Sequence, residues 1–195
     1  MNRRNVLCAA GATIALSGFA LTGCTMTGNS APTAAGNSDK RQSIDAGVDG
    51  TMSRLYTTVG GSRELVAKAN GILVFPSIIE AGFIVGARYG EGALRVGGAS
   101  VGYYSTVSGS FGFEVGAQSK ALIFLFMTQD ALAKFRSSKG WTAGVDSSVA
   151  LVRVGANGVI DATTATEPVE CIVLTNAGLM ANLSLQGTNV SPLDI

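Results

Sequence analysis

The amino-acid sequence predicts an α+β fold: a mainly antiparallel, barrel-like sheet of about eight to ten strands, N-terminal helices, and one short helix near residues 129–137. Glycine-punctuated runs of β-branched and aromatic residues between residues 71 and 116 favour strands with tight turns and bulges. Residues 121–127, ALIFLFM, are apolar throughout, and this run is far shorter than the roughly 20 residues of a membrane helix. We therefore expect a strand here that is buried on both faces.

The segment 43–59 has the apolar spacing of a helix. Its apolar residues recur every three or four positions, at Ile44, Val48, Met52, Leu55 and Val59. Ser62 is a candidate N-cap for a second helix over residues 63–69, which Gly71 would end. One interpretation is a helical hairpin packed on the sheet, and the other is an amphipathic element on a membrane surface. The mixed charge of the polar face favours the first.

Turn signals divide the rest of the chain into the segments that we expect to form strands. Residues 71–98 hold two apolar runs separated by Pro76, and a glycine-spaced tail in which Gly90-Glu91-Gly92 is interpreted as a turn. The run 99–116 ends in clear alternation of apolar with small or polar residues. After the helix at 129–137, further strands are expected at 148–154, 159–161, 171–175 and 179–185, with 188–195 as a tail.

Residues 1–23 are typical of an export signal, with a charged start and an apolar stretch over residues 6–20. They lead into Leu21-Thr22-Gly23-Cys24, which resembles a lipobox, where a lipoprotein signal peptidase cuts before a diacylated cysteine. The alternatives are an uncleaved anchor or an ordinary signal with an incidental cysteine. Arg3-Arg4-Asn5-Val6-Leu7 also resembles a twin-arginine export motif, and a plain Sec signal is the open alternative.

A polar tether is expected to join this leader to the folded domain. Residues 24–42 comprise the candidate lipidated Cys24 and a stretch rich in small and polar residues, and a random coil of that length spans roughly 20–25 Å. Residues 43–195 then form a single domain. The predicted location is a bacterial cell envelope, where acyl chains on Cys24 anchor the protein. Thr25 after the anchor cysteine indicates the outer membrane, facing the periplasm or the cell surface.

The composition argues against several classes of protein. The chain has no histidine, which removes the commonest general base and the commonest transition-metal ligand. We therefore expect no enzymatic activity, no metal and no cofactor. The formal charge is only +1, and nucleic-acid binding needs a basic surface, so no nucleic-acid partner is expected. Cys171 would be the one cysteine beyond the anchor, and we expect it to be a small buried hydrophobe.

Two groups of cations are candidates for binding an anionic lipid headgroup. The first is at the end of the helix at 129–137, next to an aromatic residue of the kind found at bilayer boundaries, and comprises Lys134, Arg136, Lys139 and Trp141. The second is on the N-terminal helices and comprises Arg54, Arg63 and Lys68. The structural alternatives are a solvated helix face with the tryptophan in the core, and scattered surface charge.

Four blocks of the sequence resemble, in order, the signature blocks of the SYLF (Ysc84-type) domain family. They are GILVFPSIIEAGFIVGARYGEGAL, SGSFGFEVGAQSKALIFLFMTQDALAKF, WTAGVDSSVALVRVG and TNAGLMANLSLQGT. The lipobox and tether resemble the bacterial lipoprotein branch of that family. The resemblance implies a lipid-binding domain, since eukaryotic members bind phosphoinositides and the yeast-type member also binds and bundles actin. Glu80 and Glu114 stand where many relatives have lysine and glutamine.

The sequence therefore predicts a lipid-anchored envelope protein whose SYLF-like domain binds membrane lipid. The resemblance implies anionic or phosphoinositide-like headgroups. The alternative is a structural or protein–protein interaction module of the envelope that binds no specific lipid.

Overall fold

The structure is a computed structural model that describes residues 34–82, 85–111, 120–152, 159–160, 165–175, 178–179, 185 and 187–195. These residues belong to one compact unit, Pro32–Ile195. The predicted signal peptide, the lipobox with Cys24, and tether residues 24–33 lie outside the described residues, as does Glu114. None of the helices described is long and apolar enough to cross a membrane.

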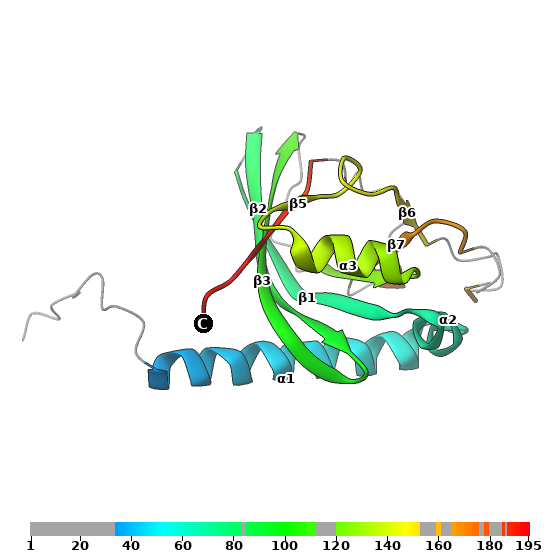
Figure 1. The fold of residues 1–195 in the computed structure, drawn as a ribbon, viewed down its shortest axis with the longest axis horizontal. Helices are drawn as coiled ribbons and strands as arrows, with labels where there is room; N and C mark the ends of the chain where they lie inside the picture. The colour runs from blue at the N-terminus through cyan, green and yellow to red at the C-terminus, as the bar shows by residue number, and fades with distance from the viewer. Residues whose placement is uncertain are drawn as a thin grey trace, which may run out of the picture. The chain divides into compact units, whose positions relative to one another are not determined.

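The α+β fold is confirmed (Figure 1). The three helices of the described ranges are α1 (Ala34–Thr58), α2 (Ser62–Lys68) and α3 (Gln129–Ser137). The longer strands are β1 (Gly71–Gly82), β2 (Val85–Val96), β3 (Ala99–Phe111), β4 (Lys120–Phe126) and β7 (Val169–Thr175). The shorter ones are β5 (Trp141–Thr142), β6 (Val149–Leu151), β8 (Gly178–Leu179) and β9 (Asn189–Pro192).

All nine of these strands belong to one curled sheet. Its order is β5-β9-β3-β2-β1-β4-β7-β6, with β8 also paired to β7. The β6–β7 pair is parallel and the other strand pairs are antiparallel. The expectation that residues 188–195 form a tail is wrong, because β9 lies between β3 and β5. Pro192, which has no N–H to donate, is the last residue of that strand.

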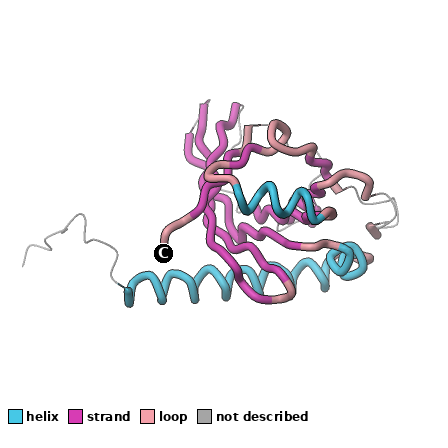
Figure 2. The backbone as a smooth tube through the Cα atoms, viewed as in Figure 1, coloured by secondary structure: helices cyan, strands magenta, loops and turns pink. Residues whose placement is uncertain are grey.

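The sheet separates two hydrophobic layers, with α3 on one face and α1 and α2 on the other (Figure 2). Strand β4 confirms the prediction for the ALIFLFM run, since each of its residues is buried. Leu122, Phe124 and Phe126 pack toward α3, whereas Ala121, Ile123 and Leu125 pack toward α1 and α2. This period-two alternation explains why the run carries no polar residue.

A bulge in β1 sets how α1 lies on the sheet. The register of β1 shifts between Val74 and Ser77 against β2, and Pro76, which cannot donate a ladder hydrogen bond, occupies the shift. A Cβ at Gly47 of α1 would lie 3.0 Å from Cγ of Pro76. The glycine that weakens α1 as a helix therefore lets the helix approach the bulge closely.

The glycines of β2 have a different role from the one predicted. The turn expected at residues 90–92 is wrong, because these residues continue the ladder with β3. A Cβ at Gly92 would lie 2.1 Å from the carbonyl oxygen of Val74, so β1 and β2 approach too closely there for any side chain. The β2–β3 turn is instead Gly97-Gly98, with φ of 59° and 86°. Two positive φ values are the requirement of a type I′ hairpin turn.

Two helix boundaries differ from prediction. Helix α1 begins at Ala34, so the tether expected over residues 24–42 is wrong for 34–42. Those nine residues lack an apolar stripe and are held by contacts with remote residues, including an ion pair from Lys40. The N-cap of α2 is Gly61 and not Ser62. The hydroxyl of Ser62 is buried and donates a hydrogen bond to the carbonyl oxygen of Val59 at 2.6 Å. The prediction for α3 is confirmed at both ends.

Candidate functional site

The cations of α3 do not converge. Lys134, Arg136 and Lys139 are all exposed, as the sequence predicts. Residues two apart on a helix point about 200° away from each other, so Lys134 and Arg136 lie on opposite flanks of the stripe that α3 buries. A single headgroup cannot bind both side chains, although a flat anionic surface can attract them together.

The role considered for Trp141 at a bilayer boundary is wrong. Only 2% of the residue is exposed, and its ring packs edge-on to Phe124 and Phe135 with centroid separations of 5.7 and 5.6 Å. The indole fills the layer between α3 and the sheet. A buried aromatic residue of this kind stabilises the fold and has no surface to offer a lipid.

The second group of cations is also dispersed. The guanidinium of Arg63 lies over the ring of Tyr56, 4.3 Å from its centroid, and so joins α2 to α1. Arg54 is two positions before Tyr56 and therefore points to the opposite side of α1. Lys68 is exposed in the last turn of α2, where a cation stabilises the helix C-terminus.

A groove of about 370 Å³ lies between α1, α2, β1 and the β2–β3 turn. Its volume is at the lower end of the range for small-molecule sites. Its uncharged lining is mainly aliphatic, with one methionine and three glycines. It comprises Val48, Met52, Tyr56, Val66, Ala67, Ala69, Asn70, Gly71, Ile72, Val74, Gly97 and Gly98. The two charged residues of the lining, Asp49 and Arg95, complete it.

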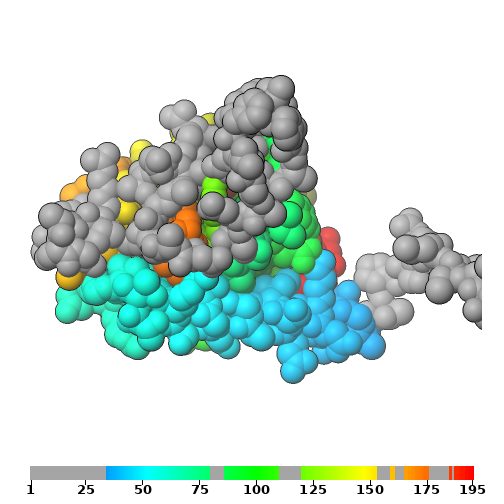
Figure 3. Space-filling view, turned by 180° about the vertical axis from the view of Figure 1, so that it is seen from behind, coloured from blue at the N-terminus to red at the C-terminus, as the bar shows by residue number. Residues whose placement is uncertain are grey.

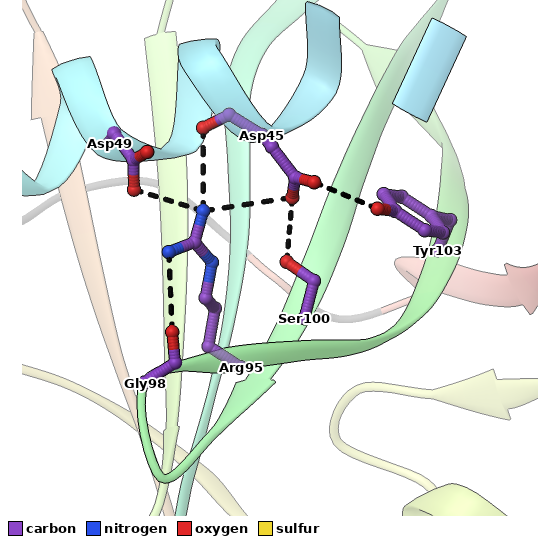
Figure 4. A network of polar contacts seen from close by, with 6 residues as sticks. All are labelled: Asp45, Asp49, Arg95, Gly98, Ser100 and Tyr103. Atoms are coloured by element: carbon purple, nitrogen blue, oxygen red, sulfur yellow. Dashed lines mark hydrogen bonds and ion pairs between the residues drawn. The ribbon is translucent and has the colours of Figure 1, made fainter. Parts of the chain in front are cut away.

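A polar network forms the charged end of the groove (Figure 4). Nη2 of Arg95 lies 2.9 Å from a carboxylate oxygen of Asp49 and 3.6 Å from one of Asp45. Asp45 also accepts hydrogen bonds from the hydroxyls of Ser100, at 2.6 Å, and Tyr103, at 2.8 Å. The network ties α1 to the β2–β3 hairpin and fixes the guanidinium beside the apolar floor.

The network carries charges of both signs. Two carboxylates face the guanidinium of Arg95, whose buried Nε atom has no hydrogen-bond partner among the described residues. The guanidinium of Arg41 lies 6.0 Å from the ring centroid of Tyr103. Burial and the hydrogen bond to Asp45 raise the pKa of Tyr103, so the phenol remains a donor at neutral pH. Both oxygens of Asp45 thus have internal donors, whereas the side chain of Asp49 is largely exposed.

Two further contacts hold the first turns of α1 against the sheet. Nζ of Lys40 lies 2.8 Å from Glu91, which also accepts a hydrogen bond from Tyr89 at 2.6 Å and thereby raises the pKa of Tyr89 to about 12. The guanidinium of Arg41 donates to the oxygen of Ile195. Figure 3 shows the red C-terminal residues beside the blue first turns of α1.

Two neighbouring groups of β7 are buried and have raised pKa values. Cys171 is completely buried in β7, and burial raises the pKa of its thiol well above the usual range. Glu170, beside it, is buried too, and the loss of hydration raises its pKa. Within the described ranges, no three Cys, Asp or Glu residues are grouped to hold a metal ion.

The groove was not predicted from the sequence. A signal was present, since Asp45 and Asp49 are four residues apart and so share one face of α1, and Arg95 interrupts an apolar strand. What the sequence could not supply is the docking of α1 against β2, which brings the two aspartates to Arg95.

Residues 107–194 match the family model for Ysc84, described as a Las17-binding protein actin regulator. Over this segment the chain is similar to the Ysc84 family. A Xenopus laevis protein, SH3 domain-containing YSC84-like protein 1, is 30% identical over 134 residues, which are 65% of this chain and 39% of that protein. The chain thus spans about two fifths of the relative's length. The Ysc84-type segment includes α3 and Trp141, whereas every groove residue precedes it.

Proposed function

We propose that this protein is a lipid-anchored component of a bacterial cell envelope whose folded unit binds membrane lipid without catalysing a reaction. One observation supports lipid binding above all: the groove combines an apolar floor with a charged end. An amphiphile has the same division, since its chain needs an apolar wall and its headgroup needs polar partners. The resemblance of four sequence blocks to SYLF domains implies the same class of ligand.

The proposed anchor is the acylated Cys24, after removal of residues 1–23. Two or more acyl chains attach a protein stably, whereas a single chain gives marginal binding. The folded unit then needs only weak affinity for its lipid. We place the protein at the outer membrane, and the exposed cations of α3 would add attraction to an anionic surface, including phosphoinositide-like headgroups.

A second candidate function is an interaction module for other envelope proteins. Ile79, Tyr89 and Val107 are direct cross-strand neighbours on β1, β2 and β3, and their exposed fractions are 63%, 44% and 50%. Such a row of exposed apolar side chains is suited to a protein partner. It is separate from the groove, so the two functions can be tested independently.

Vesicle flotation of the Pro32–Ile195 unit, which lacks Cys24, tests lipid binding without the anchor. We expect Met52→Glu, in the groove wall, to abolish flotation, and Ser53→Glu, on the exposed side of α1, to retain it. Both variants add one negative charge to the same helix. Equal flotation of the two variants would contradict a role for the groove, and failure of the unaltered unit with every vesicle composition would contradict lipid binding.

A further inference from the structure

The charged end of the groove is better suited to a zwitterion than to an anion. Of the residues that line the groove, Asp49 and Arg95 are the charged ones, and Asp45 adds a second carboxylate behind the guanidinium. Arg95 already donates toward the carbonyl oxygens of Asp45 and Gly98. At the Arg95 end, a purely anionic headgroup would meet one engaged guanidinium and two carboxylates, and like charges repel. The guanidinium of Arg63 lies over Tyr56, in another part of the lining.

Asp49 is the group that remains available to a ligand. Its side chain is 67% exposed, and Arg95 is its partner among the described residues, through one carboxylate oxygen at 2.9 Å. An ionised carboxylate has about four acceptor sites on its two oxygens, so this exposed side chain can also accept hydrogen bonds from a headgroup. An exposed ion pair of this kind is weak in water, so it can open to admit a ligand that carries both charges.

The size of the groove limits the apolar part of the ligand. About 370 Å³ lies near the bottom of the range that holds drug-sized molecules, which favours one acyl chain over two. Val48, Ile72 and Val74 form aliphatic walls along this space, and Met52 is a flexible side chain that can adapt to a chain.

We infer that the groove takes a single-chain amphiphile with a zwitterionic phosphate–ammonium headgroup, whose ammonium binds Asp49 and whose phosphate lies beside Arg95. The inference rests on the proposed function, because it presumes that the groove binds lipid. It differs from the anionic preference that the SYLF resemblance implies. The cations of α3 remain free to attract an anionic surface, since they lie in a different part of the fold.

Nuclear magnetic resonance titration of the Pro32–Ile195 unit can test this inference. The probes are lysophosphatidylethanolamine and lysophosphatidylglycerol with the same acyl chain, both below their critical micelle concentrations. The amide signals of Gly97 and Gly98 report occupancy, because both residues line the groove. We expect the ethanolamine lipid to bind more tightly by up to about fivefold, the upper value for one exposed ion pair.

Two matched variants assign the preference to one carboxylate. Asp49→Asn should bring the two affinities within about twofold of each other, whereas Asp39→Asn, which removes an exposed charge of α1 outside the groove, should leave the preference intact. Tighter binding of the glycerol lipid, or a preference that survives Asp49→Asn, would overturn the inference but leave lipid binding in place. If neither lipid shifts the two glycine signals, binding in the groove itself is refuted.

Discussion

The close approach of α1 to the β1 bulge can be measured with a pair of glycine substitutions. Gly47 and Gly50 are in the same helix, so replacing either one with leucine brings a similar gain in helix propensity, close to 1 kcal/mol. Their surroundings differ. A Cβ at Gly47 would lie 3.0 Å from Cγ and 3.1 Å from Cβ of Pro76, whereas a Cβ at Gly50 has nothing within 4 Å.

We expect Gly50→Leu to stabilise the protein and Gly47→Leu to destabilise it. Overpacking a rigid site costs about 1–3 kcal/mol, and Pro76 is in the middle of a central strand, where it cannot move aside easily. The two variants should therefore differ by about 1–3 kcal/mol in the free energy of unfolding. For a domain of this size, that is a difference of roughly 2–12 °C in Tm.

Thermal unfolding followed by circular dichroism, at one protein concentration and one pH, provides the measurement. Leucine is used because its helix propensity is close to that of alanine while its side chain is large enough to force the contact. Equal shifts in Tm for the two variants would refute the docking of α1 on the bulge. The groove would then lose one of its walls, because α1 supplies Val48, Asp49, Met52 and Tyr56.

Three further predictions concern buried side chains. Trp141→Ala should lower the free energy of unfolding by about 3–5 kcal/mol, because the indole is buried. The tryptophan emission of the native protein should not change when vesicles are added. A blue shift on adding vesicles would show that the indole contacts lipid. Cys171 should resist a thiol reagent at pH 8 until the protein is unfolded, because burial raises its pKa, and rapid labelling of the native protein would contradict its burial. Burial also raises the pKa of Glu170, so the protonated carboxyl favours the folded state. Its contribution to the free energy of unfolding is fully present below the pKa of the unfolded state and is lost as pH rises through the pKa of the folded state. Glu170→Gln should therefore be more stable than the unaltered protein at pH 7 and flatten the pH dependence of stability above pH 4, and a loss of stability at pH 7 would contradict this reasoning.

The parts of the fold that the sequence predicted are those in which a local pattern decides the structure. Strand β4 is apolar on both faces because it is central in the sheet, and α3 has a side-chain cap at Thr128 and a buried stripe of the correct period. The start of α1 has no such pattern. Residues 34–42 are helical because Lys40 and Arg41 contact residues far away in the sequence, and no local signal encodes those contacts.

The candidate site was predicted less well, for a geometric reason. Lys134 and Arg136 are close in the sequence, but the helical repeat separates their side chains. Trp141 follows Lys139 and Gly140, yet aromatic partners from β4 and α3 bury it. The groove depends on residues between positions 48 and 98 in four different elements, which only the strand register and the docking of α1 bring together.

The central claim is that lipid binds between α1 and the sheet, and photocrosslinking tests it most directly. A lysolipid with a photoreactive acyl chain would be added to the Pro32–Ile195 unit, irradiated, and located by peptide mass spectrometry. We predict that the label attaches to Met52 and Ile72 of the groove, and that an excess of the unlabelled lipid removes it. Labelling confined to the surface of α3 around Lys134 would contradict the claim.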